Sequence, residues 1–566
     1  MKNELIELVE KKTRGKKIPA NNKSTARHFR IHKERPFLYE ERETTTVLVG
    51  GLSPAHDYLF EATMKGLGVK TVALPNTNLD AFHLGREYGN NGYCNPAYFT
   101  VGNLIRYLRN LEKSGIPKEE IIENYVFFTI GCNAPCRFGM LETEYRMAMK
   151  DCGYEGFRIL VFENEGGLNQ KIQGKGVQVN PEFFLATVNA LNMADVVSEL
   201  GYAIRPFEVE EGKTNEVMEK ALKYLYDKLQ NKRRVVFKGW KDIFFKKLHL
   251  TNTALFLVRF IEQLKSNYYT DALKEVRKMF EAVEVDRFKS KTTVKITGEF
   301  WAITTVGEGN FNMFRFLEKE GAVLLVEPVA SLIQLLFSKG LLRHENRREM
   351  LLKDRIKGWW QVRKRYKNYL KFQKKRQTLL LGNFLFRREY SRLLKALGGN
   401  NHMLIKQSIL QEVANPFYNI NIEGAEGYME IAKNIYYHEH KLCHMVLSLK
   451  PFGCMPSTQS DGVQAAVIEK YKDIIFLPLE TSGDGETNAQ SRVLMSLGDA
   501  RVKAKTEMAT AKETVQSTME EMRDYVNRNP ILKSPFYIVP KHNGTVSQAA
   551  NFIYHVDALI KQETAA

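Results

Sequence analysis

The sequence predicts an α/β protein made of two doubly wound sheet domains, with helical inserts and a helical C-terminal region. Two observations support this class. Short apolar runs alternate with amphipathic helical segments, and they do so in two separate stretches of the 566-residue chain. A strand, a glycine turn, a helix and a second strand form a βαβ unit, which produces a parallel sheet. The length is several times that of one domain of roughly 100–200 residues, so we expect two or three packed domains.

The first α/β domain is expected over residues 46–180. Its predicted strands are short apolar runs, and amphipathic helices are predicted at 55–66, 99–114 and 139–151. The strands are TVLVGGL at 46–52, VKTVAL at 69–74, YVFFTI at 125–130 and FRILVF at 157–162.

The second α/β domain is expected in two pieces, 291–332 and 401–500. A helix is predicted at 310–320, and the region from 333 to 400 interrupts the domain. Its strands are VKITGEF after Thr293, AVLLVEP from Ala322, CHMVLSL at 443–449 and DIIFLPL at 473–479.

The other segments are predicted from their composition. Residues 1–45 are a polar, basic N-terminal arm, 181–290 a helical region, 333–400 a basic helical insert, and 501–566 a C-terminal helix and tail.

Most of the net charge of +18 lies in one segment. Residues 341–400 contain 18 Lys and Arg against four Asp and Glu. Such a segment can bind nucleic acid, an anionic cofactor or an acidic partner, or it can be a solvated helical face. Aromatic residues that alternate with the basic ones are typical of nucleic-acid binding. Because apolar residues recur here at helical spacing, we expect these aromatics to pack inward; they are Trp359, Trp360, Tyr366, Tyr369 and Phe372.

The chain has no run of about 18 apolar residues and no apolar segment after its charged first residues, so we expect a cytoplasmic protein. Six cysteines are too few for a disulfide scaffold. Cysteines beside Gly and Pro in a reducing compartment indicate metal binding or catalysis more often than crosslinks.

Four cysteines lie in Gly- and Pro-containing loops at the ends of predicted elements. Cys94 is in GYCNP before a helix, Cys132 and Cys136 are in GCNAPCRFG after a strand, and Cys454 is in PFGCMPS after another strand. Ligands of doubly wound sheets bind at the carboxyl ends of the strands. Thiols at helix N-termini are expected to have depressed pKa values, which favours metal ligation.

Soft thiolates favour iron–sulfur clusters, Zn or Cu(I). Structural zinc sites usually have two close pairs of ligands, whereas here one C-x3-C pair is combined with two solitary cysteines. That distribution favours a cluster held between domains. The cysteines can also be small buried apolar residues. This second interpretation is the preferred one for Cys152 and Cys443.

Four stretches of the chain resemble the acyl-CoA dehydratase activase-related proteins. They are VGGLSPAHDYLFEATMKGLGVKTVALP near the start, NGYCNPAYFTVGNLIRYL around Cys94, GCNAPCRFGMLETEYRMAMKDCGYEG from Gly131, and PFGCMPS around Cys454. The family is related to the subunits of 2-hydroxyacyl-CoA dehydratase and benzoyl-CoA reductase. The resemblance covers most of the chain outside the arm and parts of the helical inserts.

The resemblance implies a [4Fe-4S] or larger cluster between two flavodoxin-like domains. Cys94, Cys136 and Cys454 match the family's cysteine positions, and Cys132 is a candidate fourth ligand. Electrons would come from a separate ATP-hydrolysing activator, in keeping with the lack of a G-x4-G-K-[ST] motif in this chain.

The expected function is that of an iron–sulfur redox component, whose substrate would be a CoA thioester or another small reducible molecule. A lyase or reductase activity, a non-catalytic scaffold for the activator, and a homo- or hetero-oligomer all stay open. We expect no membrane contact, and nucleic-acid binding is the less favoured alternative.

Overall fold

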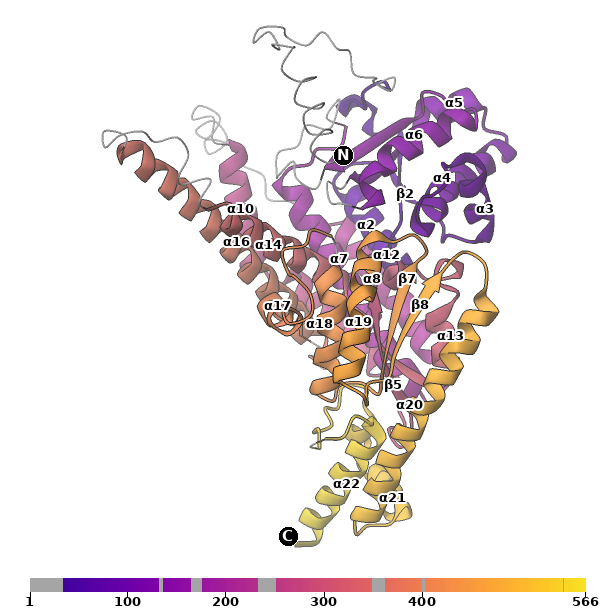
Figure 1. The fold of residues 1–566 in the computed structure, drawn as a ribbon, viewed down its shortest axis with the longest axis vertical. Coiled ribbons are helices and arrows are strands. Elements are labelled where there is room, and N and C mark those ends of the chain that lie inside the picture. Colours follow the sequence, from indigo (N-terminus) through magenta and orange to yellow (C-terminus); the bar gives the residue numbers. More distant parts are fainter. Residues whose placement is uncertain are drawn as a thin grey trace, which may run out of the picture. The chain divides into compact units, whose positions relative to one another are not determined.

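The computed structural model describes residues 34–131, 136–163, 176–232, 251–348, 362–399, 403–424, 426–542 and 544–565 (Figure 1). Within these ranges it confirms the α/β class and contains two parallel four-stranded sheets. Both sheets belong to one compact unit, Pro36–Ala566.

The first sheet has the strand order β2-β1-β3-β4, and all its neighbouring strands are parallel. The strands are β1 (Thr46–Val49), β2 (Thr71–Ala73), β3 (Tyr125–Gly131) and β4 (Arg158–Glu163). The helices of this part are α2 (Pro54–Gly66), α3 (Leu79–Tyr88), α4 (Asn95–Lys113), α5 (Lys118–Asn124) and α6 (Leu141–Asp151). Of these, α3 and α5 were not predicted from the sequence.

The second sheet repeats this topology with the order β6-β5-β7-β8. Its strands are β5 (Thr292–Gly298), β6 (Ala322–Leu325), β7 (Met445–Pro451) and β8 (Phe476–Thr481). The helices α12 (Phe300–Thr304), α13 (Met313–Lys319), α18 (Gly427–Glu439), α19 (Met455–Lys470) and α20 (Glu486–Thr514) accompany it. Leu447 and Val493 are in one hydrophobic cluster, so α20 covers one face of the sheet. On the other face Tyr437 of α18 packs against Val446.

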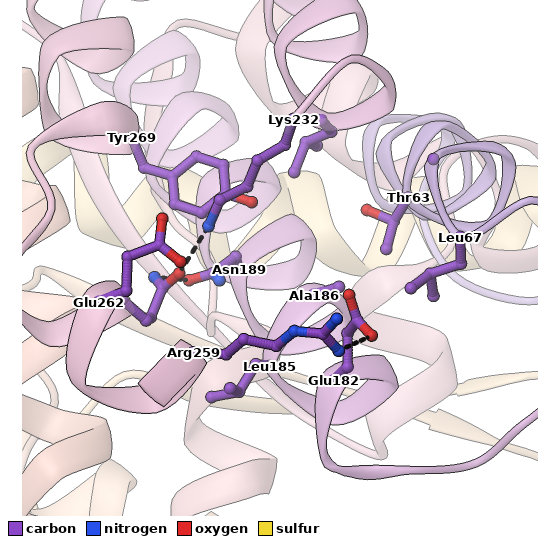
Figure 2. Close-up of a pocket in the computed structure, with 13 residues that line it drawn as sticks. Thr63, Leu67, Glu182, Leu185, Ala186, Asn189, Lys232, Arg259, Glu262 and Tyr269 are labelled. Carbon is purple, nitrogen blue, oxygen red and sulfur yellow. Dashed lines mark hydrogen bonds and ion pairs between the residues drawn. The ribbon is translucent and has the colours of Figure 1, made fainter. Parts of the chain in front are cut away.

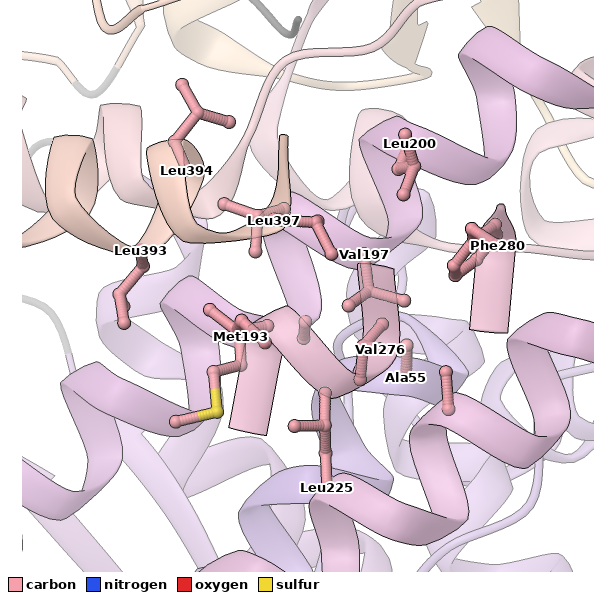
Figure 3. Close-up of a cluster of buried hydrophobic side chains, with 14 of the residues drawn as sticks. Ala55, Met193, Val197, Leu200, Leu225, Val276, Phe280, Leu393, Leu394 and Leu397 are labelled. Carbon is pink, nitrogen blue, oxygen red and sulfur yellow. The ribbon is translucent and has the colours of Figure 1, made fainter. Parts of the chain in front are cut away.

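The helical region and part of the insert share one hydrophobic core (Figure 3). Met193 and Val197 of α7 (Pro181–Ile204) pack with Leu225 of α8 (Lys213–Gln230), Val276 of α11 (Tyr268–Phe280) and Leu393 of α16 (Val362–Leu397). The regions 181–290 and 333–400 are therefore joined through their side chains. In the described residues of these regions the other α-helices are α10 (Thr251–Lys265) and α14 (Val329–Asn346), and α17 (Gln407–Ala414) follows the insert.

Two sequence-based expectations about the charged helices are wrong. One helix and a tail were expected over residues 501–566. This region instead contains the end of α20, which runs across residue 500, and two further helices, α21 (Met519–Arg528) and α22 (Gln548–Ala565). In the basic insert Phe372 is buried, as expected, but Tyr366 and Tyr369 are exposed. Trp359 and Trp360 lie outside the described residues.

Candidate functional site

Both sheets change winding direction between their two central strands. In the first sheet this point lies between β1 and β3, and in the second between β5 and β7. Loops at the carboxyl ends of such strands form the ligand-binding crevice of doubly wound sheets. Cys136 follows β3, Glu299 follows β5, and Cys454 follows β7.

Three of the predicted cysteines occupy the same kind of local position. Cys94 is the N-cap residue of α4, Cys454 that of α19, and Cys136 that of the short 3-10 helix Arg137–Met140. Pro96 and Pro456 follow in the first turns of α4 and α19, where the missing amide hydrogen of proline costs no helical hydrogen bond. The two long helices therefore direct the positive ends of their dipoles toward the thiols of Cys94 and Cys454.

The loops that carry these cysteines meet. The Asn95 amide donates to the Phe452 carbonyl at 3.4 Å, joining the loops of Cys94 and Cys454. Gly453 has a φ of +80°, and a Cβ there would lie 3.6 Å from Cys94 Cα and 3.1 Å from Arg137 Nη1. The left-handed backbone conformation favours glycine at this position. The residue before Cys454 thus touches the loops of Cys94 and Cys136.

The remaining cysteines do not belong to this junction or cannot be placed. Cys132 lies outside the described residues. Cys152 ends α6 within the hydrophobic cluster of the first sheet, and Cys443 lies near the start of β7, at the end opposite Cys454. These two positions agree with a packing role.

Two carboxyl groups, the half-buried Glu299 and the buried Glu426, lie beside the cysteines and were missed by the sequence analysis. Burial raises the pKa of both groups, and the charge of Glu299 raises that of Glu426 further. The Glu299 carboxylate also accepts a hydrogen bond from the Ala302 amide at 3.0 Å. Its place directly after the glycine that ends β5 was the available signal, whereas Glu426 has no comparable sequence signature.

The expectation of depressed thiol pKa values is wrong for the metal-free protein. Burial, followed by the charge of Glu299, raises the pKa of Cys94 to about 11. Burial raises the pKa of Cys136 to about 12 and that of Cys454 as well. The two carboxylates and the loss of solvent therefore outweigh the helix ends. Negative charge in this junction needs a cation to compensate it.

The pair of carboxyl groups makes a pH-dependent contribution to stability. The unfolded pKa of Glu426 is 4.5 and its folded pKa is about 8, so between these values the folded state binds more protons and its stability falls as pH rises. The free energy of unfolding of the metal-free protein should therefore fall between pH 5.5 and pH 8. We expect Glu426→Gln to make this fall smaller by roughly 1–3 kcal/mol. Urea denaturation at the two pH values measures this, with exposed Glu120→Gln as the control. An unchanged pH dependence in Glu426→Gln would contradict the assignment.

A small cavity lies directly behind Glu426. Its volume is about 20 Å³, enough for about one water molecule. It reaches the ends of β5 and β6 and the start of α18, and its polar lining consists of Thr297, Glu327, Ser331, Glu426, Glu430 and Lys433. Polar groups thus continue from the cysteine junction into the interior of the second sheet domain.

A larger pocket of about 70 Å³ lies among the helices around α7 and α10 (Figure 2). Arg259 pairs with Glu182, and Lys232 donates to Gln263 Oε1 at 3.2 Å. Both cationic side chains of this pocket are thus paired with neighbouring side chains.

The loop after β8 ends at Gly485, which has a φ of +95°, and α20 starts at the next residue, Glu486. Glycine favours this left-handed backbone conformation. Arg492 donates to the Pro478 carbonyl of its own sheet domain.

Among the residues that the structure describes, no group of three or more His, Cys, Asp or Glu side chains is placed to hold a single metal ion. The junction itself consists of converging loops that carry three thiols, and Cys thiolates are the usual ligands of iron–sulfur clusters.

Comparisons with known proteins add no name to this site. No protein-family profile matches the chain, and no curated protein matches it significantly. In the described part of the chain, no helix is long and apolar enough to cross a membrane.

Proposed function

We propose that this chain is an iron–sulfur redox protein similar to the 2-hydroxyacyl-CoA dehydratase subunits. Cys94, Cys136 and Cys454 would hold a [4Fe-4S] or larger cluster between two flavodoxin-like domains, with Cys132 as the candidate fourth ligand. The observation that carries the proposal is the contact of Gly453 with the loops of Cys94 and Cys136. It brings the loop of Cys454 to the loops of two cysteines that lie more than 300 residues earlier in the sequence.

The surroundings supply what such a group needs. The N-termini of α4 and α19 offer amides and positive dipole ends to the negative charge of thiolates and sulfides. An aromatic cluster of Phe82, Phe99 and Trp301 packs at the boundary of the two sheet domains, with Phe99 and Trp301 ring centroids 5.4 Å apart. These rings exclude water beside α4 and keep the site in a low dielectric.

When bound, the cluster would supply one-electron chemistry at low potential. The protein's own groups set its conditions. Each ligating thiol must release a proton, and the raised pKa values of Cys94 and Cys136 make that release depend strongly on pH. Glu299 and Glu426 can hold protons beside the site because burial raises their pKa values toward neutrality. A reducible substrate such as a CoA thioester would receive electrons, and could receive protons, at one place.

Iron and sulfide analysis of anaerobically purified protein tests the proposal. We expect about four irons per chain in the wild type and a loss of most of them in Cys136→Ala and Cys454→Ala. Cys152→Ala is the matched control, because its thiol lies in the hydrophobic cluster of the first sheet and should leave the iron content unchanged. A colourless, iron-free wild-type protein would refute the proposal.

An activator experiment separates the redox component from a non-catalytic scaffold. ATP-dependent reduction of the protein by a purified activator, followed by turnover of a reducible substrate, would support the redox component. Reduction without any turnover would favour the scaffold.

A further inference from the structure

The α16 helix carries an exposed apolar stripe along its outer face. The side chains of Tyr366, Tyr369, Leu370, Leu381 and Phe384 are between 42% and 63% exposed. At 100° per residue, the five fall within an arc of about 120° on the helix surface, as two groups with Gln373 and Gln377 between them on the same arc. We call these five residues the outer stripe.

The inner face of α16 is fixed against the rest of the insert. Phe372 is buried and stacks on His344 of α14 with ring centroids 4.2 Å apart, and the His344 Nε2 atom lies 3.0 Å from the Phe372 carbonyl. Farther along, Phe386 packs on Phe337 of α14 at 6.2 Å. The outer stripe therefore cannot turn inward without loss of these contacts.

Positive charge borders the first half of the stripe, up to Arg376, and follows again just after its end at Arg387 and Arg388. Residues 362–388 contain ten Lys and Arg and no Asp or Glu. Lys367, Lys371 and Lys374 are exposed and follow the stripe along one flank, at helix angles between its edge and the buried face. An apolar stripe beside a cationic flank is typical of helices that lie in the surface of an anionic membrane.

We propose that the outer stripe of α16 docks this protein onto an anionic lipid surface, with the apolar side chains among the acyl chains and the lysines at the head groups. The stripe runs for about 27 Å from Tyr366 to Phe384, parallel to the bilayer plane in the docked state. This departs from the sequence-based expectation of no membrane contact, which rested on the lack of a spanning segment.

Charge and shape favour lipid over the other occupants. A second copy of α16 packed on the stripe would bring the two cationic flanks together without an acidic residue to offset them. A nucleic acid would gain stacking from Tyr366 and Tyr369, but Leu370 and Leu381 have no ring to stack on bases. Lipid accepts the aromatic and the aliphatic side chains equally well.

Vesicle flotation of the full-length protein tests the proposal. The probes are vesicles of phosphatidylcholine alone and of phosphatidylcholine with 30% phosphatidylglycerol. We expect binding only to the anionic vesicles, with a partition coefficient about 100-fold lower in Lys367→Gln/Lys371→Gln/Lys374→Gln. Leu381→Ser/Phe384→Ser should lower it at least about tenfold, because apolar side chains are removed from the interface.

A control variant has the same net charge as the Lys367→Gln/Lys371→Gln/Lys374→Gln variant. Lys220→Gln/Lys274→Gln/Lys278→Gln removes three exposed lysines from α8 and α11 and should bind like the wild type. Wild-type protein that does not float with anionic vesicles would overturn the proposal. The proposal would also be overturned if the Leu381→Ser/Phe384→Ser variant bound anionic vesicles as well as the wild type does. A preference for RNA over vesicles that is unchanged in this variant would overturn it too. Circular dichroism of each variant distinguishes lost docking from lost folding.

Discussion

Replacing Glu327 by alanine should lower the free energy of unfolding by about 3–5 kcal/mol, the largest effect expected of a charge substitution here. Glu327 follows β6 and pairs with Lys295 of β5 at 2.7 Å and with Lys433 of α18 at 2.9 Å. Burial alone would raise the pKa of Glu327, but the two lysine charges lower it well below its usual range. Without this carboxylate, two buried ammonium groups would lose their common partner.

Chemical denaturation measures this loss, and an exposed pair provides the control. Glu345 contacts Arg376 at 2.5 Å on the surface of the insert, so Glu345→Ala should cost less than about 1 kcal/mol. Conversion of Lys295, Glu327 and Lys433 together to methionine should recover most of the stability lost in Glu327→Ala, since no charge is then left unpaired. Equal losses in Glu327→Ala and Glu345→Ala would show that the buried network is unimportant.

Gly102→Ala is expected to cost about 3 kcal/mol and to lower the iron content as well. A Cβ at Gly102 would lie 1.7 Å from the Ala81 carbonyl oxygen, and one at Gly85 would lie 1.9 Å from the Tyr98 carbonyl oxygen. Helices α3 and α4 therefore touch through their backbones, which cannot yield as a flexible side chain can. Because Cys94 is the N-cap residue of α4, separation of the two helices would move that thiol away from the junction.

The control for this substitution is another helical glycine. Gly498 lies within α20, and a Cβ there meets no atom within 4 Å. Gly498→Ala should stabilise the protein by about 0.5–1 kcal/mol, because alanine loses less backbone entropy in a helix. Denaturation should therefore show a loss of stability in Gly102→Ala and a gain in Gly498→Ala. Iron analysis should show a loss of iron in Gly102→Ala alone. Normal stability of Gly102→Ala would contradict the close contact of α3 and α4.

The sequence predicted the strands better than the helices around them. All eight strands coincide with short apolar runs, because both faces of a parallel sheet are covered. Helix α3 was missed since LDAFHLGREY combines a polar surface with Gly85, a residue that disfavours helices. Only the packed structure shows that Gly85 serves the contact with α4.

The sequence indicated the cysteines of the candidate site but not its carboxyl groups. Each cysteine loop is marked by Gly and Pro beside a predicted element end. Glu426 owes its role to burial against Glu299 across 127 positions of the chain, which no local pattern reveals. The exposure of Tyr366 was also mispredicted, because helical spacing shows that a stripe exists without showing which side of the helix is covered.

The interruption of the second sheet has a consequence for synthesis of the chain. Leu447 of β7 pairs with Ile296 of β5, and the whole insert is translated between them. At about 5–20 residues per second, β5 and β6 emerge roughly ten seconds before the strand that completes them. During that interval β5 has an unpaired edge, and the loop of Cys454 does not yet exist. The first sheet can form on the ribosome, but the cysteine junction can close only near the end of translation, so any cluster must be inserted into an essentially finished chain.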